Sequence, residues 1–234
     1  MKKLILTLLC FVTVLLLSAQ TKERLSLDHY QNYEWTSSPQ LSPDGEQVLY
    51  SRGWINLKDD RRESDLWIVN IDGSMNRFFL NGSNGRWSPD GTKVAFTKKG
   101  EPEGTQIFIK YLGVEGDPTQ ITKLEKSPSS MVWSPDGKYL AFIMHVDAAP
   151  ALKLKGIPSP PKGAKWTQAP RVIDQVDYSA DRVGFLPRGY RQIFIVPADG
   201  GTARQITDGD WNVSGGISWT QDSKSLILRD NLTY

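Results

Sequence analysis

Short segments of alternating apolar and polar residues recur along the chain, and each follows the same kind of turn. The clearest four lie at residues 47–50, 93–96, 139–142 and 225–228. An apolar period of two is typical of a β-strand with one buried face, whereas an amphipathic helix has a period of about 3.6. Because Pro and Gly supply the backbone angles that tight turns need, a Pro-Asp-Gly turn before such a segment predicts a β-hairpin.

The turn itself is an internal repeat. Ser-Pro-Asp-Gly occurs three times and is followed by a diverged Thr-Gln-Asp-Ser copy, at residues 42–45, 88–91, 134–137 and 220–223. Successive aspartates of these turns are 46, 46 and 86 residues apart, at Asp44, Asp90, Asp136 and Asp222. An aspartate side chain can accept hydrogen bonds from backbone N–H groups within its turn, which explains the recurrence without any catalytic role.

Two further apolar segments complete each unit. Third strands are predicted at 65–69, 106–110 and 192–196, and fourth strands at 119–122 and 203–207. Four short strands in a unit of about 45 residues are typical of a β-propeller blade. Helical repeats of this length are excluded by the period of two and by the abundance of Val, Ile, Trp and Phe. The predicted fold class is therefore all-β, a β-propeller of four-stranded blades.

The repeat predicts about three and a half blades, at residues 38–82, 84–124 and 130–208, with a partial blade from 215. Known closed propellers have about four to eight blades, so we expect the propeller in this sequence to be incomplete. The remaining blades are expected to come from chain outside this sequence, whether through a split gene, a truncated gene or a partial sequence. Residues 20–234 alone are expected to aggregate or oligomerise, because unpaired strand edges would be exposed.

Residues 147–191 are predicted to interrupt the third blade between its second and third strands. The interruption begins with a Pro-rich stretch that opposes regular structure, and residues 172–178 and 181–185 are apolar enough to pair as a small hairpin. Loops longer than about 15 residues are usually functional or disordered. Two interpretations stay open: a solvated excursion, or a loop that reaches over an adjoining domain or a substrate path.

The first residues predict a secretory signal peptide at 1–19, followed by a lead-in segment at 20–37. Lys2 and Lys3 precede an uncharged apolar run at 4–17, and small residues follow it. The run is shorter than the roughly 20 residues of a comfortable membrane span, although an uncleaved anchor is the alternative. The signal peptide looks bacterial, so the expected location is periplasmic or secreted.

Removal of residues 1–19 lowers the formal net charge from +2 to 0 and removes the sole cysteine, Cys10. A chain without net positive charge lacks the concentrated basic face that nucleic acid binding needs. Absence of cysteine from residues 20–234 excludes disulfides, thiolate catalysis and cysteine-ligated metal there.

The search for catalytic chemistry finds no convincing site, so no catalytic residue, metal site or cofactor is predicted, and substrate-binding residues stay unassigned. No Gly-x-Ser-x-Gly pentapeptide is present, and Asn-Gly-Ser-Asn-Gly at 81–85 is interpreted as a turn between blades. His29 and His145 are interpreted as packed or surface imidazoles. The acidic stretches 58–60 and 208–210 lack the register of an EF-hand and are interpreted as solvated turns.

Three other features are assigned to the fold or the surface. Arg61 and Arg62 are expected to be a surface charge pair in the loop between the second and third strands of the first blade. Tryptophans at one repeat position are expected to pack between blades; they are Trp87, Trp133 and Trp219. Glycosylation sequons, relevant only in a host that glycosylates, begin at Asn81, Asn212 and Asn231.

The repeated units resemble the propeller repeats of two groups. These groups are TolB-like periplasmic propellers and the prolyl oligopeptidase family of serine peptidases, in its acylaminoacyl-peptidase and dipeptidyl-peptidase branch. The segments 177–185, 191–196 and 200–210 look like a stretch that those peptidases carry midway through the propeller, and 25–45 looks like their mature N-terminus. The resemblance covers nearly all of residues 20–234.

The resemblance to the peptidases implies a substrate-gating propeller that precedes an α/β-hydrolase domain with a Ser, Asp and His triad. It implies short peptides as substrates, and the hydrolase domain and remaining blades as partners. None of the triad positions exists in this sequence, so the expected function is the non-catalytic propeller portion of an exported peptidase. The alternatives are a TolB-like module that binds partner proteins, and an enzyme with its own site in the propeller channel.

Overall fold

The computed structural model describes residues 24–149, 160–167, 173, 176, 178–181 and 183–230. The predicted signal peptide at 1–19 and the sequon at Asn231 lie outside these residues. Within them, no helix is both long and apolar enough to span a membrane.

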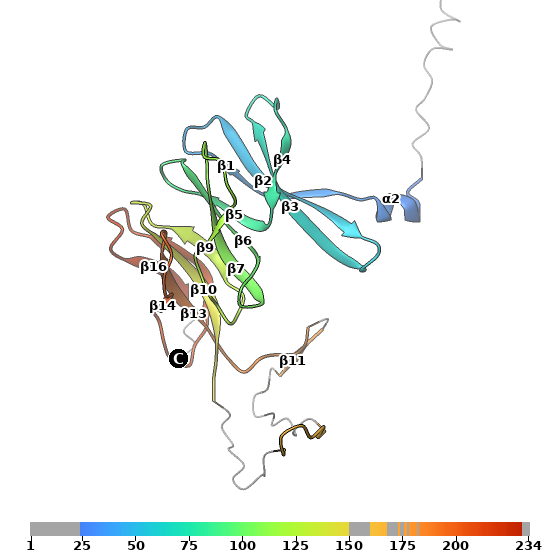
Figure 1. The fold of residues 1–234 in the computed structure, drawn as a ribbon, viewed down its shortest axis with the longest axis vertical. Helices are drawn as coiled ribbons and strands as arrows, with labels where there is room; N and C mark the ends of the chain where they lie inside the picture. The colour runs from blue at the N-terminus through green and yellow to red at the C-terminus, as the bar shows by residue number, and fades with distance from the viewer. Residues whose placement is uncertain are drawn as a thin grey trace, which may run out of the picture.

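Antiparallel sheets follow one another along the chain and stand side by side like the blades of a fan (Figure 1). Blade 1 consists of β1 (Trp35–Leu41), β2 (Gln47–Asn56), β3 (Arg61–Asn70) and β4 (Arg77–Asn81). Blade 2 consists of β5 (Ser83–Trp87), β6 (Lys93–Gly100), β7 (Gly104–Tyr111) and β8 (Thr119–Gln120). Blade 3 consists of β9 (Ser129–Trp133), β10 (Tyr139–Asp147), β13 (Gly189–Pro197) and β14 (Arg204–Gln205). Blade 4 contributes β15 (Val213–Trp219) and β16 (Leu226–Asp230).

In blades 1, 2 and 3 each strand pairs with the next strand of its blade, in the up-and-down order that the repeat predicts. This arrangement confirms the all-β propeller fold of four-stranded blades. One short helix, α2 (Leu27–Gln31), precedes blade 1 and begins at Ser26, whose hydroxyl accepts a hydrogen bond from the His29 backbone N–H. The helix is an addition to the prediction, which described residues 20–37 only as a lead-in segment.

The repeated turn has the same hydrogen bonds in every copy. In blade 2, the Ser88 hydroxyl donates to Asp90 Oδ1 at 2.5 Å and accepts from the Lys93 backbone N–H at 2.9 Å. The same carboxylate oxygen accepts from the Thr92 N–H at 3.1 Å. Equivalent bonds in the other turns join Ser42 to Asp44, Ser134 to Asp136 and Thr220 to Asp222. The aspartates therefore hold the hairpins together, as the repeat predicts.

Acid is expected to weaken these turns. The Ser88 hydroxyl is the main cause that lowers the pKa of Asp90 from 3.8 to about 2, and the threonine at the equivalent position lowers the pKa of Asp222. Because the folded state favours the ionised carboxylate, its stabilising contribution is complete above about pH 4 and is lost as the pH falls towards 2. Asp90→Asn should destabilise the chain at pH 7 and flatten this pH dependence, measured as urea midpoints between pH 2 and pH 7.

Asp117→Asn provides the matched control, because Asp117 is an exposed loop residue outside the turns. This substitution should leave both the urea midpoint and its pH dependence close to those of the unmodified chain. An Asp90→Asn variant with the unmodified pH dependence would show that the turn carboxylate does not couple folding to protonation.

Three hydrophobic cores lie between successive blades. The first joins blades 1 and 2, the second joins blades 2 and 3, and the third joins blade 3 to β15 and β16. In the first, Leu49 and Leu66 of blade 1 pack against Val94 and Phe96 of blade 2. The sheets of blades 2 and 3 are therefore buried on both faces, which explains nearly continuous apolar runs such as residues 140–143 of β10.

Residue sizes alternate across these cores. One repeat position holds Leu49, Ala95 and Ala141. The residues that share a core with them, from the first strand of the next blade, are Gly85, Met131 and Ile217 respectively. A Cβ atom at Gly85 would lie 2.7 Å from Leu49 Cδ2, so the large Leu49 requires glycine opposite it. Where alanine replaces that leucine, methionine or isoleucine fills the space.

A buried glutamine anchors the outer strand of blades 2 and 3. Gln106 is 0% exposed, and its Oε1 accepts from Thr122 Oγ1 at 3.0 Å and from the Leu124 N–H at 2.8 Å. Its Nε2 donates to the Leu124 carbonyl at 2.9 Å. Gln192 makes a related set of bonds: its Oε1 accepts from Thr207 Oγ1, and its Nε2 donates to the carbonyls of Gly209 and Trp211. The side chains thus replace backbone pairing beyond the two-residue strands β8 and β14.

Blade 1 has a partly exposed apolar face on the side away from blade 2. Leu41 and Phe78 are 55% and 47% exposed there. Tyr50, on the same face, occupies the repeat position of Phe96 and Phe142, which are fully buried between blades. This face is therefore of the type that a neighbouring sheet covers. Self-association of residues 20–234 stays a prediction.

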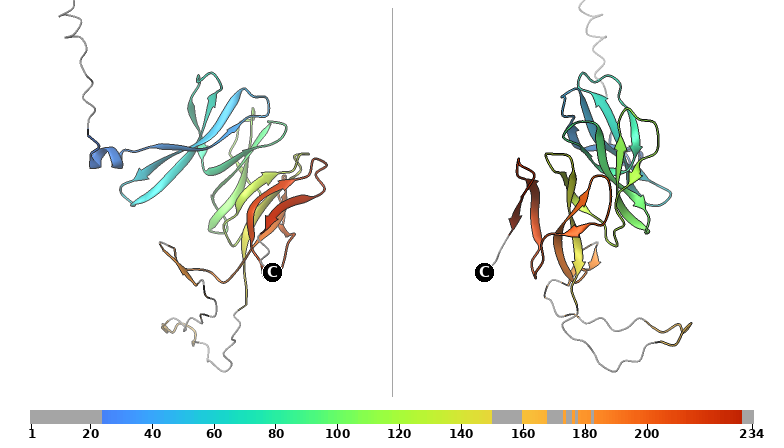
Figure 2. Two further views of the ribbon diagram at one scale, coloured as in Figure 1. Left: turned by 180° about the vertical axis from the view of Figure 1, so that it is seen from behind. Right: turned by 60° about the vertical axis from the view of Figure 1, so that its left-hand side comes forward.

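The interruption of blade 3 is slightly shorter than predicted. β10 and β13 stay paired as far as Asp147 and Gly189, so the chain leaves the blade at 148 and returns at 188, instead of the predicted 147 and 191. A small hairpin is present, with β11 (Ser179–Ala180) paired to β12 (Gly184–Phe185). Most of the predicted partner segment 172–178 lies outside the described residues. The hairpin lies beyond the end of blade 3 and apart from its sheet (Figures 1 and 2).

Candidate functional site

The first strands of the four sheets, β1, β5, β9 and β15, converge on one another, and we call them the inner strands. Neighbouring inner strands are in contact along the whole series. Each contains a register irregularity in its pairing with the second strand. The residues at the bulges of β1, β5 and β9 have left-handed backbone angles and lie one repeat apart, at Ser38, Asn84 and Ser130. Bulges of this kind re-aim side chains, and here they shape the convergence of the blades.

Arg86 lies at this convergence and contacts three inner strands. Its Nη1 donates to the Gly85 carbonyl of β5 at 2.8 Å, and its Nε donates to the Met131 carbonyl of β9 at 3.2 Å. With the Gln40 amide oxygen of β1 directed at Arg86, that oxygen accepts from Nε at 3.2 Å and from Nη1 at 2.8 Å. Burial lowers the pKa of the guanidinium. No motif in the sequence singles out this residue.

The repeated tryptophans pack between blades, as predicted, but they differ in hydrogen bonding. The Trp133 indole N–H donates to the Arg86 carbonyl at 3.0 Å and thereby ties β9 to β5. The indole N–H groups of Trp87 and Trp219 are buried without a hydrogen-bond partner among the described residues. Trp133 therefore contributes both packing and a polar link at the convergence.

A groove of about 1040 Å³ runs between blades 2 and 3. Its apolar lining includes Leu124, Met144 and Phe194, and its polar lining includes His145 and Asp147. His145 Nε2 lies 3.3 Å from Asp147 Oδ1, and Lys126 Nζ lies 3.0 Å from Asp147 Oδ2.

His145 also joins the two ends of the interruption in blade 3. Its Nε2 lies 3.2 Å from the carbonyl oxygen of Arg188, the last residue before β13. The Ala148 backbone N–H donates to the same oxygen at 3.2 Å. His145 is thus packed at the base of the interruption. His29 lies in α2, which precedes blade 1 and is separate from the interruption (Figure 1).

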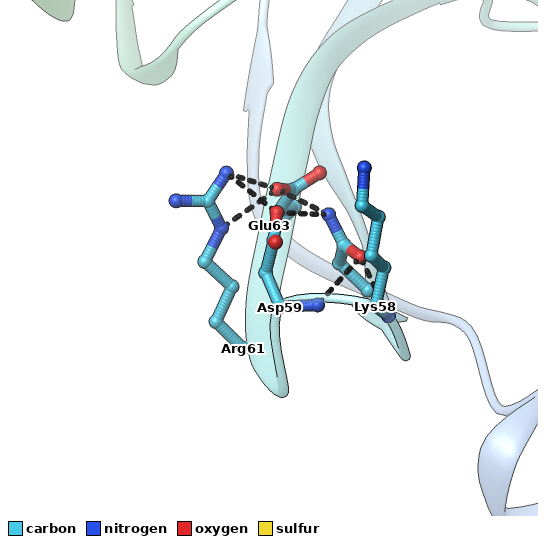
Figure 3. Close-up of polar contacts among 5 residues, drawn as sticks. Lys58, Asp59, Arg61 and Glu63 are labelled. Carbon is cyan, nitrogen blue, oxygen red and sulfur yellow. Dashed lines mark hydrogen bonds and ion pairs between the residues drawn. The ribbon is translucent and has the colours of Figure 1, made fainter.

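The hairpin of β2 and β3 ends in a network of polar side chains (Figure 3). Glu63 Oε1 accepts from Asn56 Nδ2 at 2.9 Å and from Arg61 Nε at 2.9 Å. The hydrogen bond from Asn56 is the first cause that lowers the Glu63 pKa, followed by the one from Arg61. Asp59 joins the network through Asn56 and Arg61.

This network corrects the prediction for Arg61 and Arg62. Both belong to β3 and not to the loop, because β2 and β3 pair up to Asn56 and Arg61. Arg61 pairs with carboxylates, whereas the Arg62 guanidinium lies 5.5 Å from the centre of the Trp35 ring. The hairpin extends beyond the apolar segments at 47–50 and 65–69 that predicted its strands. Its tip is held by polar contacts, which the alternation of apolar residues does not indicate.

The other candidate residues do not assemble into a site. Asp208 and Asp210 are exposed, and Asn81 ends β4, where its amide donates to Asp65 Oδ1 at 2.9 Å. The 81–85 stretch therefore passes from one strand into the next at Gly82 and is not the predicted turn. Among the described residues, no group of three His, Cys, Asp or Glu side chains is placed to hold a metal ion.

Comparison with known proteins finds peptidases among the curated proteins that the chain is similar to. No family model matches the chain. The uncharacterized peptidase YuxL of Bacillus subtilis is 24% identical over 217 residues, which cover 91% of this chain and 32% of YuxL. Dipeptidyl-peptidase 5 of Porphyromonas endodontalis is 30% identical over 106 residues, which cover 44% of this chain and 15% of that protein. The chain thus spans about a third or less of the curated relatives that it matches.

Solved structures agree on the fold. The acylaminoacyl peptidase of Pyrococcus horikoshii superposes with a TM-score of 0.62 at 18% identity, over 85% of this chain and 28% of that protein. Together with the two relatives, this similarity confirms the predicted resemblance to the propeller region of the prolyl oligopeptidase family.

Proposed function

We propose that this chain is the substrate-gating, non-catalytic propeller portion of an exported serine peptidase of the prolyl oligopeptidase family. The observation that carries the proposal is the match of 91% of the chain to only 32% of a peptidase. The 234 residues contain no Gly-x-Ser-x-Gly pentapeptide, so a serine nucleophile of the α/β-hydrolase type must come from outside them.

The gating role draws on the arrangement of the inner strands. They line the region where a propeller has its central channel, and Arg86 lies among them with its hydrogen-bonded neighbours. In the proposed gate, this channel admits extended short peptides and rejects folded proteins. The groove between blades 2 and 3 gives a second surface, on which an adjoining hydrolase domain can rest. Export of the protein is proposed only from the signal peptide that the sequence predicts at residues 1–19.

An activity assay tests the non-catalytic role. The purified full chain should not hydrolyse dipeptidyl or acyl-aminoacyl reporter substrates, because it lacks the nucleophile. Turnover that persists through successive purification steps and follows the protein quantitatively would overturn the proposal. Turnover that disappears on purification would be a contaminant and would leave the non-catalytic role intact.

A further inference from the structure

Arg86 carries a positive charge that its surroundings do not neutralise. Every contact of its guanidinium described above is to a neutral oxygen, from Gly85, Met131 or Gln40. Within the described residues, no carboxylate lies within ion-pair distance of it. By contrast, Arg52 pairs with Glu34 and Arg61 pairs with Glu63. A half-buried cation surrounded by neutral acceptors favours the binding of an anion.

The free donors of Arg86 are at Nη2. Nε and Nη1 are engaged with carbonyl and amide oxygens, whereas Nη2 donates no hydrogen bond to the described residues. Nη2 is not one of the fully buried polar atoms that lack a hydrogen-bond partner, so this nitrogen is accessible to solvent. The two hydrogens on Nη2 can therefore meet a ligand without disturbing the contacts that position the side chain.

We propose that Arg86 binds a carboxylate of a peptide at the convergence of the inner strands. The carboxylate is either the C-terminal α-carboxylate or the side chain of an acidic residue, since both present the same two oxygens. The proposal rests on the gating function, because it names the chemical group that the gate selects. Fixed neutral contacts hold the guanidinium in place, so little side-chain freedom remains to be lost on binding.

Isothermal titration calorimetry of the full chain with three N-acetylated tripeptides tests the proposal. Ac-Ala-Ala-Phe with a free carboxylate, its C-terminal amide, and the amide of Ac-Ala-Glu-Phe separate the α-carboxylate from the side-chain source. A charged hydrogen bond to carboxylate should make at least one of the two anionic peptides bind about tenfold or more tightly than the neutral amide. Arg86→Gln should abolish this difference, and Arg86→Lys should retain part of it.

Arg52→Gln is the matched control, since it removes an arginine that is half-buried like Arg86 but lies in β2 of blade 1, and it should leave the preference unchanged. If Arg86→Gln fails to fold, the comparison of anionic and neutral peptides on the unmodified chain still decides. Equal binding of all three peptides would overturn the carboxylate site while leaving a peptide gate intact. Binding of none of them, or an unchanged preference in Arg86→Gln, would also overturn it.

Discussion

Gly85→Met is expected to destabilise the chain by about 3 kcal/mol, because methionine would overpack the core between blades 1 and 2. The first added carbon alone would lie 2.7 Å from Leu49 Cδ2 and 3.0 Å from Leu66 Cδ1. Both leucines are only 1% exposed, so they have little room to move. Chemical denaturation followed by tryptophan fluorescence measures the loss. Gly216→Met is the control, since nothing lies within 4 Å of a Cβ atom there.

The same core predicts rescue by a second change. Leu49→Ala alone should cost about 3 kcal/mol through the cavity it leaves. The double variant Leu49→Ala with Gly85→Met recreates the Ala95 and Met131 pair of the next interface. The loss of stability in the double variant should therefore be smaller, by about 1 to 3 kcal/mol, than the sum of the losses in the two single variants. Strict additivity would mean that the two positions do not share one packing site.

Gln106→Leu is expected to destabilise the chain by about 3 kcal/mol, because buried donors and acceptors would lose their partner. Leucine has a similar volume, so packing changes little, but Thr122 Oγ1 and both backbone groups of Leu124 would be left without Gln106. Gln192→Leu should have a comparable effect in blade 3, since it removes the same network.

Gln221→Leu is the control for these two variants, because Gln221 is exposed in the fourth turn. It should change the free energy of unfolding by less than about 0.5 kcal/mol. A loss below about 1 kcal/mol for both Gln106→Leu and Gln192→Leu would contradict the anchoring role of the buried glutamines.

Local features of this fold could be predicted from the sequence because their partners are close along the chain. The aspartate of each repeated turn is bonded to a serine or threonine two residues earlier and to a backbone N–H two residues later. The strand after each turn follows from the apolar period of two. These contacts depend only on turn geometry and side-chain alternation, which the amino-acid order specifies directly.

Contacts between blades could not be predicted in the same way. Gly85 and Leu49 are complementary only because consecutive blades face each other, and nothing local marks the pair. Arg86 has Gln40 and Val132 as its counterparts in the neighbouring repeats, so comparison of the repeats does not mark this position as functional. The buried glutamines did leave a signal: Gln-Ile-Phe-Ile at 106–109 and 192–195 is followed about 15 residues later by Thr122 and Thr207. That spacing could have indicated a repeated polar anchor.

The central claim is that this propeller portion works with a serine hydrolase that supplies the catalytic triad. Immunoprecipitation of the endogenous protein with antibodies to residues 24–149, followed by labelling with a fluorophosphonate that reacts with activated serines, tests it most directly. We expect a labelled serine hydrolase in the precipitate, on the same polypeptide or on one bound to it, together with peptidase activity. A precipitate that contains the propeller chain but neither a labelled hydrolase nor peptidase activity would show that the propeller does not work with a serine hydrolase.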